Sequence, residues 1–212
     1  MNIVKPPESL IRLTRQNPFD RFPDGRPRVP NDIVERMKLV TTEEAWAVLR
    51  KHGYERQFEG GWFQTHPERI LVGRAVTAMM VPHRPDLHDL VQEIGEAEGR
   101  IGGQNSWVID TLEIDDVMVV DMRGKVKDGT FVGDNLSTSV RTRTQAGAVI
   151  HGGIRDYDGI RKLTDVTFFH RGMDPSAIKN VTLAGCNYPI RIGRTAVLPG
   201  DVAVSYTHLT LP

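Results

Sequence analysis

The sequence predicts an α/β fold, in which strands and helices alternate along the chain after a helical extension at the N-terminus. Three apolar runs, at residues 69–81, 117–122 and 148–153, are rich in β-branched side chains and have the length of buried strands. Segments with apolar residues at helical spacing lie between these runs. The 212 residues, 39% of them hydrophobic, are enough for one well-buried core. Alternation of this kind is typical of a sheet with helices packed on it.

The first 35 residues form a separate region, which we interpret as a proline-rich N-terminal arm. Six of the thirteen prolines of the chain lie within residues 1–30. Proline fixes the φ angle and removes a backbone donor, so it disfavours regular structure. We therefore expect an irregular extension that lies on the surface of the domain or on a neighbouring subunit.

A pair of helices is predicted next, where the α/β domain of residues 36–204 begins. Apolar residues recur at helical spacing in the segment DIVERMKLV, residues 32–40. Thr41 and Glu44 have the spacing of a capping box, in which each side chain binds the other residue's backbone N–H group. Gly53 suits the end of this second helix.

The rest of the domain alternates until its last third, which is richer in strands. Residues 86–99 predict an amphipathic helix that ends in glycine. The strand-rich end argues against a purely doubly wound sheet. The remaining predicted elements are a weak helix at 136–147, a short helix at 158–163, a strand at 166–172 and several strands within 180–204.

Charge and cysteine content exclude several classes of protein. Lys plus Arg and Asp plus Glu both number 27, so no global positive field favours nucleic acid as a partner. The one cysteine, Cys186, excludes an internal disulfide and fits a reducing compartment. The first residues lack the apolar core of a signal peptide, and no run approaches the ~18 apolar residues of a membrane span. We expect a cytoplasmic protein with no membrane partner.

The first candidate site is the turn formed by Gly133, Asp134, Asn135 and Leu136, between a buried strand and a helix. Backbone N–H groups at a helix N-terminus attract a carboxylate or a phosphate. Gly133 would allow a ligand to approach the backbone closely. The alternative is that Asp134 or Asn135 only caps the helix.

The second candidate site is the Arg155–Asp156 pair, which follows the strand that ends in Gly152-Gly153. Open α/β folds tend to bind ligands just beyond strand ends. An arginine offers a planar fork for a carboxylate, and an aspartate offers a hard oxygen ligand for a cation. The alternative is a surface ion pair, worth about 0–1 kcal/mol.

The segment GDNLSTSVRTRTQAGAVIHGGIRD, which contains both candidate sites, resembles the signature of the RraA-like family. This family includes the regulator of ribonuclease E activity and the class II 4-hydroxy-4-methyl-2-oxoglutarate aldolases, which also decarboxylate oxaloacetate. Gly133 and Arg155 stand 22 positions apart, the spacing of the family pattern. The resemblance continues through FFHRG and PGDV, and so covers approximately residues 70–204.

The resemblance implies a β/β/α swivelling-domain fold, assembled as a homotrimer or hexamer with sites between subunits. It implies that residues 133–136 form the substrate-binding turn, that Arg155 holds the carboxylate and 2-oxo oxygen of the substrate, and that Asp156 is the metal ligand. A single direct carboxylate suits Mg²⁺ or Mn²⁺, which keep several waters, better than zinc.

The function that this resemblance implies is that of a divalent-metal-dependent lyase, a carbon–carbon lyase that cleaves or decarboxylates a small 2-oxo acid. Both reactions pass through a pyruvate enolate, whose developing charge a cation and a guanidinium would stabilise. The alternative function is that of a non-catalytic regulator that binds a ribonuclease. Both uses share one scaffold, so the fold does not separate them.

Two departures from the family pattern affect these expectations. Members commonly have an acidic residue three positions after the aspartate of the R-D pair, but that position here is Gly159. The family also continues from PGDV into D-x-x-G-V-x-x-x-P, whereas residues 205–212 read SYTHLTLP. We expect these last residues to be a foreign or truncated end.

Overall fold

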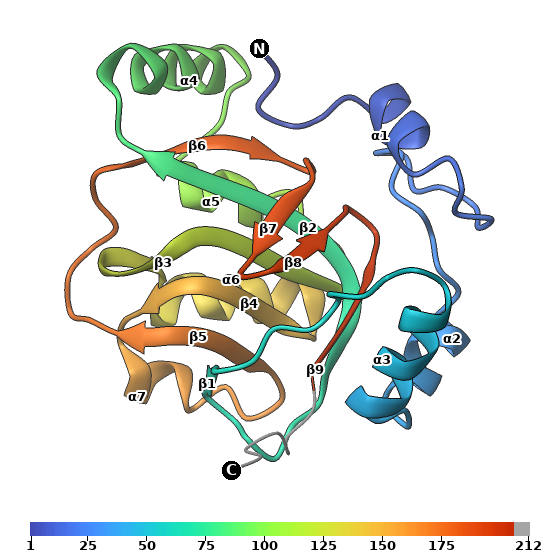
Figure 1. The fold of residues 1–212 in the computed structure, drawn as a ribbon. Coiled ribbons are helices and arrows are strands. Elements are labelled where there is room, and N and C mark those ends of the chain that lie inside the picture. Colours follow the sequence, from blue (N-terminus) through green and yellow to red (C-terminus); the bar gives the residue numbers. More distant parts are fainter. Residues whose placement is uncertain (206–212) are drawn as a thin grey trace.

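The structure, a computed structural model, describes residues 1–205 and is built around a seven-stranded mixed sheet (Figure 1). The strands lie in the order β1-β5-β4-β3-β2-β6, and β9 also pairs with β2. Strands β2 to β5 are parallel neighbours, whereas β1, β6 and β9 are antiparallel to theirs. The strands are β1 (Phe63–Gln64), β2 (Leu71–Pro82), β3 (Asp116–Val132), β4 (Gly147–Ile154), β5 (Thr167–Met173), β6 (Val181–Cys186) and β9 (Val202–Ser205).

The two faces of the sheet are covered differently. Helices α4 (Pro85–Ala97), α5 (Gln104–Ile109), α6 (Asp134–Thr144) and α7 (Tyr157–Ile160) contribute to the larger core on one face. The hairpin of β7 (Ile190–Ile192) and β8 (Thr195–Val197) packs on the other face, where Ile190 and Ile192 join a smaller core. Figure 1 shows α5 and α6 on one side of the sheet and the hairpin on the opposite side. A sheet with helices on one face and a hairpin on the other confirms the predicted α/β class.

The predicted helix pair is confirmed as α2 (Asn31–Met37) and α3 (Thr42–Lys51). Both bonds of the capping box are present, because Thr41 Oγ1 accepts from the Glu44 N–H group and Glu44 Oε2 accepts from the Thr41 N–H group. Two other features were not predicted. Helix α5 is only six residues long, too short for a periodic signal. Strand β3 continues to Val132, because its pairing with β4 resumes after an irregular stretch that follows Asp121.

The N-terminal arm is irregular over most of residues 1–30, as its prolines predict, but it contains one helix that they do not predict. Residues Pro7–Leu13 form helix α1, because Pro7 occupies the first helical position, where its fixed φ angle and missing donor are tolerated. Leu10 of this helix is fully buried, and Ile3 is 1% exposed. The arm therefore contributes buried side chains, and the division of the chain at residue 35 stays a prediction.

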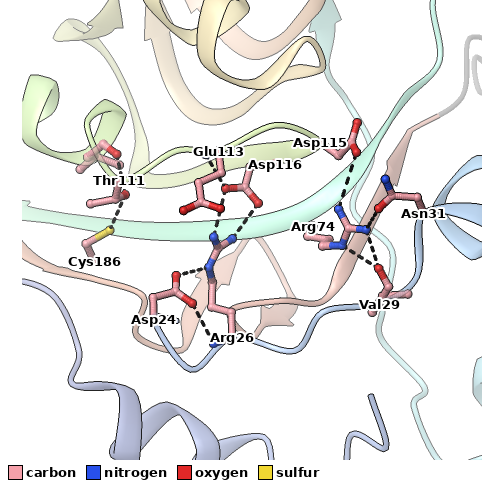
Figure 2. Close-up of polar contacts among 11 residues, drawn as sticks. Asp24, Arg26, Val29, Asn31, Arg74, Thr111, Glu113, Asp115, Asp116 and Cys186 are labelled. Atoms are coloured by element: carbon pink, nitrogen blue, oxygen red, sulfur yellow. Dashed lines mark hydrogen bonds and ion pairs between the residues drawn. The ribbon is translucent and has the colours of Figure 1, made fainter. Parts of the chain in front are cut away.

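A buried ion pair fastens the arm to the sheet (Figure 2). The two terminal nitrogens of Arg26 donate to the two carboxylate oxygens of Asp116, at 2.8 and 3.1 Å. Both side chains are 1% exposed. Arg74 of β2 makes a second connection, since its Nε donates to the backbone oxygen of Val29 at 2.8 Å. The sequence shows prolines in this region but not the buried charges that hold it.

Two expectations concern the ends and the surroundings of the chain. Ser205 is the last residue of β9, and the expected atypical end otherwise falls on residues 206–212, outside the described residues. Among residues 1–205, no helix is long and apolar enough to cross a membrane.

Candidate functional site

The first candidate segment begins helix α6. Gly133 is the N-cap residue in an extended conformation, and its carbonyl oxygen accepts from the Ser137 N–H group at 2.9 Å. Asp134 is the first helical residue and accepts from the backbone N–H group of Asn135 at 2.8 Å, so neither of these two residues is the cap. Leu136 packs against the larger core, which leaves Asp134 and Asn135 facing solvent.

The second candidate segment follows β4 and begins helix α7. The Arg155 N–H group donates to the carbonyl oxygen of Val132 at 3.1 Å, which ties this segment to the end of β3. Asp156 has left-handed backbone angles, φ 54° and ψ 42°, and is the N-cap residue of α7. Its carbonyl oxygen accepts from the N–H groups of Gly159 and Ile160, at 2.9 and 3.1 Å.

The fold brings the two segments into direct contact at the carboxyl ends of β3 and β4. A Cβ atom added to Gly133 would lie 2.3 Å from Oδ2 of Asp156 and 3.0 Å from Nε of Arg155. Gly159 makes a similar contact from α7, where an added Cβ atom would lie 2.6 Å from the Cβ atom of Asp134. Because these positions have no room for a side chain, the two segments pack directly against each other and place their charged groups side by side.

The charged groups of this surface remain open to solvent. Arg155 Nε lies 3.4 Å from Oδ2 of Asp156, and the two side chains are 40% and 48% exposed. A contact of this length and exposure contributes little to stability. Among residues 1–205, Arg155 makes no other ion pair or side-chain hydrogen bond, so its two terminal nitrogens are available to an anion.

The carboxylates at this surface fit only a cation that keeps most of its waters. No group of three or more His, Cys, Asp or Glu side chains placed to hold a metal ion occurs among residues 1–205. Zinc sites normally need three or four such ligands, whereas Mg²⁺ binds through one or two carboxylates and retains water. The half-exposed Asp156, held against Gly133 where no Cβ atom fits, is compatible with the second arrangement.

A buried histidine, His170, contacts the residue that follows Asp156, and it was not singled out from the sequence. The ring of His170 in β5 lies between Phe63, stacked at 5.8 Å, and Tyr157, edge-on at 6.3 Å. Its Nδ1–H group donates to the carbonyl oxygen of Gly172 at 3.0 Å. Burial lowers the pKa of His170, so the ring is neutral at pH 7. The segment FFHRG predicts a strand, but nothing local in it indicates that His170 contacts the residue after Asp156.

Gly133→Ala is expected to impair the site without unfolding the domain. The added methyl group needs the space of the Asp156 carboxylate, so that carboxylate and Arg155 must move apart. Gly133 has a φ angle of −113°, which alanine adopts without strain. We expect at least tenfold weaker Mg²⁺ and oxalate binding, measured by calorimetry, with an unchanged thermal unfolding midpoint. Gly60→Ala is the control on mutating a glycine, because Gly60 does not have a positive φ angle and an added Cβ atom there meets only the Phe58 ring, at 3.5 Å.

Solved structures with the same fold have titles that name different kinds of protein. The chain matches RraAS2 of Streptomyces coelicolor, titled an unusual member of the RNase ES inhibitor RraA family, with a TM-score of 0.67 and 23% identity over 88% of this chain and 83% of that one. It matches a structure titled as novel cellulases from microbes of the gut ecosystem with a TM-score of 0.69 and 20% identity, over 96% and 83% of the two chains. The RNA-processing inhibitor RraA from Thermus thermophilis gives a TM-score of 0.53 and 18% identity, over 76% and 87%.

A family model identifies the chain more directly than these structures do. The model described as RraA-like, Aldolase/RraA, matches residues 32–206. That range includes the whole sheet, both candidate segments and the buried histidine, and leaves out most of the N-terminal arm. The match covers more than half of the chain and every strand of the sheet, and this chain therefore belongs to the RraA-like family.

Proposed function

We propose that this protein is a divalent-metal-dependent lyase that cleaves or decarboxylates a small 2-oxo acid to give pyruvate. The observation that carries the proposal is the contact of Gly133 with Asp156 and Arg155, which places a guanidinium and a carboxylate beside a helix N-terminus. A purely docking protein would not require this combination of groups.

The chain's own residues would divide the work as follows. The two free nitrogens of Arg155 would donate to the planar C1 carboxylate and to the 2-oxo oxygen of the substrate. The N–H groups of Asp134 and Leu136 in the first turn of α6 would bind a second carboxylate through the positive end of the helix dipole. Charge that develops on the 2-oxo oxygen as the pyruvate enolate forms would then face a fixed cation, Arg155, with little reorganisation.

Asp156 would hold the metal ion, Mg²⁺ or Mn²⁺, through one carboxylate oxygen. When bound, such an ion acts as a Lewis acid toward a carbonyl oxygen. Left-handed backbone angles and the close contact with Gly133 fix the position of the Asp156 carboxylate relative to Arg155. The turn Gly133–Leu136 would bind the substrate, and because Gly133 has no side chain, it would leave the Asp156 carboxylate accessible to the metal ion and the substrate.

The direct test is release of pyruvate from oxaloacetate and from 4-hydroxy-2-oxo acids, with Mg²⁺, with Mn²⁺ and with excess chelator. Turnover that needs the metal and saturates with substrate supports the proposal. Absence of turnover above the rate of the free metal ion, over the whole panel, contradicts it.

Arg155→Lys is expected to weaken both substrate binding and turnover, because lysine keeps the charge but lacks the bidentate fork. We expect oxalate, a planar mimic of the enolate, to bind at least tenfold more weakly by calorimetry, with a raised KM for oxaloacetate. Arg161→Lys on the same side of the sheet is the control, since Arg161 donates to a backbone oxygen of the chain itself. Unchanged oxalate affinity in the Arg155 variant would remove this residue from the binding site.

A second candidate function is regulation of a ribonuclease by direct binding, because one matched structure is titled a member of the RNase ES inhibitor RraA family and another the RNA-processing inhibitor RraA. Such a protein would inhibit RNA cleavage in the absence of metal and would keep that effect in Arg155→Lys. A ribonuclease inhibition assay on both forms, beside the pyruvate assay, separates the two functions. Assembly as a trimer or hexamer stays a prediction from the family resemblance.

A further inference from the structure

Two histidines lie side by side where strand β2 passes into helix α4. His83 follows the last residue of β2, and His88 is the fourth residue of α4. The centroids of their rings are 4.7 Å apart, and the ring planes are tilted by 55°. Figure 1 shows α4 beside β6, whereas α7, which begins after Asp156, lies beside β5. Among residues 1–205, neither histidine makes a hydrogen bond, ion pair or ring contact with Arg155 or Asp156, so the pair is a separate feature.

The ring of His88 is held by strand β6. Its Nδ1 atom lies 3.1 Å from Oγ1 of Thr182, a side chain that is fully buried. When the Nδ1–H group donates this bond, Nε2 keeps its lone pair and is the atom that binds a metal ion. Histidines that bind metals commonly donate their second ring N–H group to an oxygen of the protein, which fixes the tautomer and the ring orientation. Thr182 therefore prepares His88 as a ligand.

The ring of His83 has no competing partner. The side chain is exposed, and among residues 1–205 it makes no hydrogen bond or ion pair. Its backbone is fixed nevertheless, since the N–H group of His83 donates to the carbonyl oxygen of Asn180 at 2.9 Å. A ring nitrogen of His83 is thus available to the ion that His88 binds, and no bond within the chain has to break.

The spacing of the two rings indicates which ions fit. An imidazole nitrogen binds a divalent transition metal at about 2.0–2.1 Å, which puts the ring centroid about 3.2 Å from the ion. Centroids 4.7 Å apart then correspond to an angle of about 95° at the ion. This angle is close to the ~90° between neighbouring ligands of a square-planar ion and smaller than the ~109° of a tetrahedral one. Nitrogen ligands in square-planar geometry are typical of Cu²⁺ and Ni²⁺.

The charge around the pair also suits a cation. Helix α4 contains four acidic side chains and no Lys or Arg. Arg84, between the two histidines in the sequence, is paired with Asp86, and two of its nitrogens donate to the carboxylate at 2.8 Å. Asp89, next to His88, is exposed and makes no ion pair among residues 1–205. The surroundings of the two rings therefore have an excess of negative charge.

We propose that His83 and His88 form a two-histidine site for a divalent transition-metal ion of the Cu²⁺ or Ni²⁺ type, with Thr182 as a positioning residue. No third His, Cys, Asp or Glu among residues 1–205 is placed to join them, so water completes the coordination. The ion would connect the turn after β2 to α4 and, through Thr182, to β6. This site is independent of the proposed lyase activity, because Asp156 offers an oxygen to a hard ion and the pair offers imidazoles to a softer one.

The first test is a calorimetric titration with Ni²⁺ of the chain without a histidine tag, in excess Mg²⁺ so that an oxygen site is already occupied. His83→Ala and His88→Ala are each expected to bind Ni²⁺ at least tenfold more weakly than the wild type, since each leaves a single imidazole. His52→Ala, which removes an exposed histidine at the end of α3, is the control and keeps the wild-type affinity. Absence of Ni²⁺ binding by the wild type, unchanged affinity in either variant of the pair, or a loss in Asp156→Asn instead would each overturn the proposal.

The second test separates one prepared site from two unconnected surface histidines. Thr182→Val keeps the shape of the side chain but removes the Oγ1 atom that bonds to His88, and is expected to weaken Ni²⁺ binding about tenfold. Thr142→Val is the control, because that hydroxyl bonds within its own helix, α6. Electron paramagnetic resonance of the Cu²⁺-loaded chain is expected to show coupling to two nitrogens in the wild type and to one in His83→Ala. Unchanged affinity in Thr182→Val, or coupling to one nitrogen in the wild type, would show that the two rings do not form one site.

Discussion

Asp156→Asn is expected to abolish metal-dependent turnover while the fold stays intact. Asparagine keeps the size of the side chain but removes the charge that would bind the cation, which should cost several kcal/mol of transition-state stabilisation. The expected loss in kcat/KM is on the order of a hundredfold or more. The side chain is 48% exposed and its contact with Arg155 is long, so little folding energy depends on it. The measurement is oxaloacetate decarboxylation across a Mg²⁺ titration, with circular dichroism and a thermal melt.

Asp158→Asn is the matched control for this experiment. Asp158 lies two positions further along, is exposed, and is the acidic residue nearest to the position that Gly159 occupies. It should keep activity within about threefold of the wild type, since the atoms nearest to Gly133 belong to Asp156 and Arg155. Wild-type activity of Asp156→Asn at limiting Mg²⁺ would refute the assignment of Asp156 as the ligand, and a large loss in Asp158→Asn would move the assignment to that residue.

Arg26→Met is expected to lower the free energy of unfolding strongly. The substitution leaves Asp116 with an uncompensated charge, at a position where its side chain is 1% exposed. Breaking a buried pair in this way typically costs about 3–5 kcal/mol. Urea denaturation at a fixed protein concentration, followed by tryptophan fluorescence, should show the midpoint fall accordingly.

Two further variants show whether the loss comes from the unpaired charge. Arg28→Met changes an exposed arginine two positions away and should alter the free energy of unfolding by no more than about 0.5 kcal/mol. Replacing both partners, Arg26→Met with Asp116→Leu, removes the buried charge altogether and should recover most of the loss. If the double variant were as unstable as Arg26→Met, packing of the arm rather than the charge would explain the effect.

The elements with strong local signals were predictable from the sequence. The capping box at Thr41 and Glu44 and the amphipathic helix that became α4 depend on neighbours within one or two turns, so a single segment contains the whole signal. The sequence did not predict helix α1, because the six prolines of residues 1–30 favour irregular structure. Only one apolar side chain of this helix, Leu10, is buried. Residues beyond the helix contact it, since Arg21 donates to the backbone oxygen of Thr14 at 2.8 Å and Gly25 packs against the backbone of Pro7, and helical periodicity does not contain such contacts.

The sequence predicted which residues form the candidate site, but it did not predict how they are placed relative to one another. The spacing of Gly133 and Arg155 indicated a shared site through the family resemblance, whereas the contact of Gly133 with the Asp156 carboxylate is a property of the folded chain. The contact of His170 with Tyr157 could not be predicted from the sequence, for a different reason. A histidine in an apolar strand is read as a core residue, and only the register of β5 against β1 and β4 places it beside Tyr157.

The left-handed backbone at Asp156 restricts which acidic residue can stand there. Aspartate and asparagine enter this region several times more often than most other side chains, because their short polar groups bond locally to the backbone. Glutamate would bring the same charge on a longer stem, at a backbone angle it disfavours, and its carboxylate would extend past Gly133. The shape of the turn thus favours aspartate over glutamate at this position, and a change from aspartate to glutamate, conservative by charge, is not conservative here.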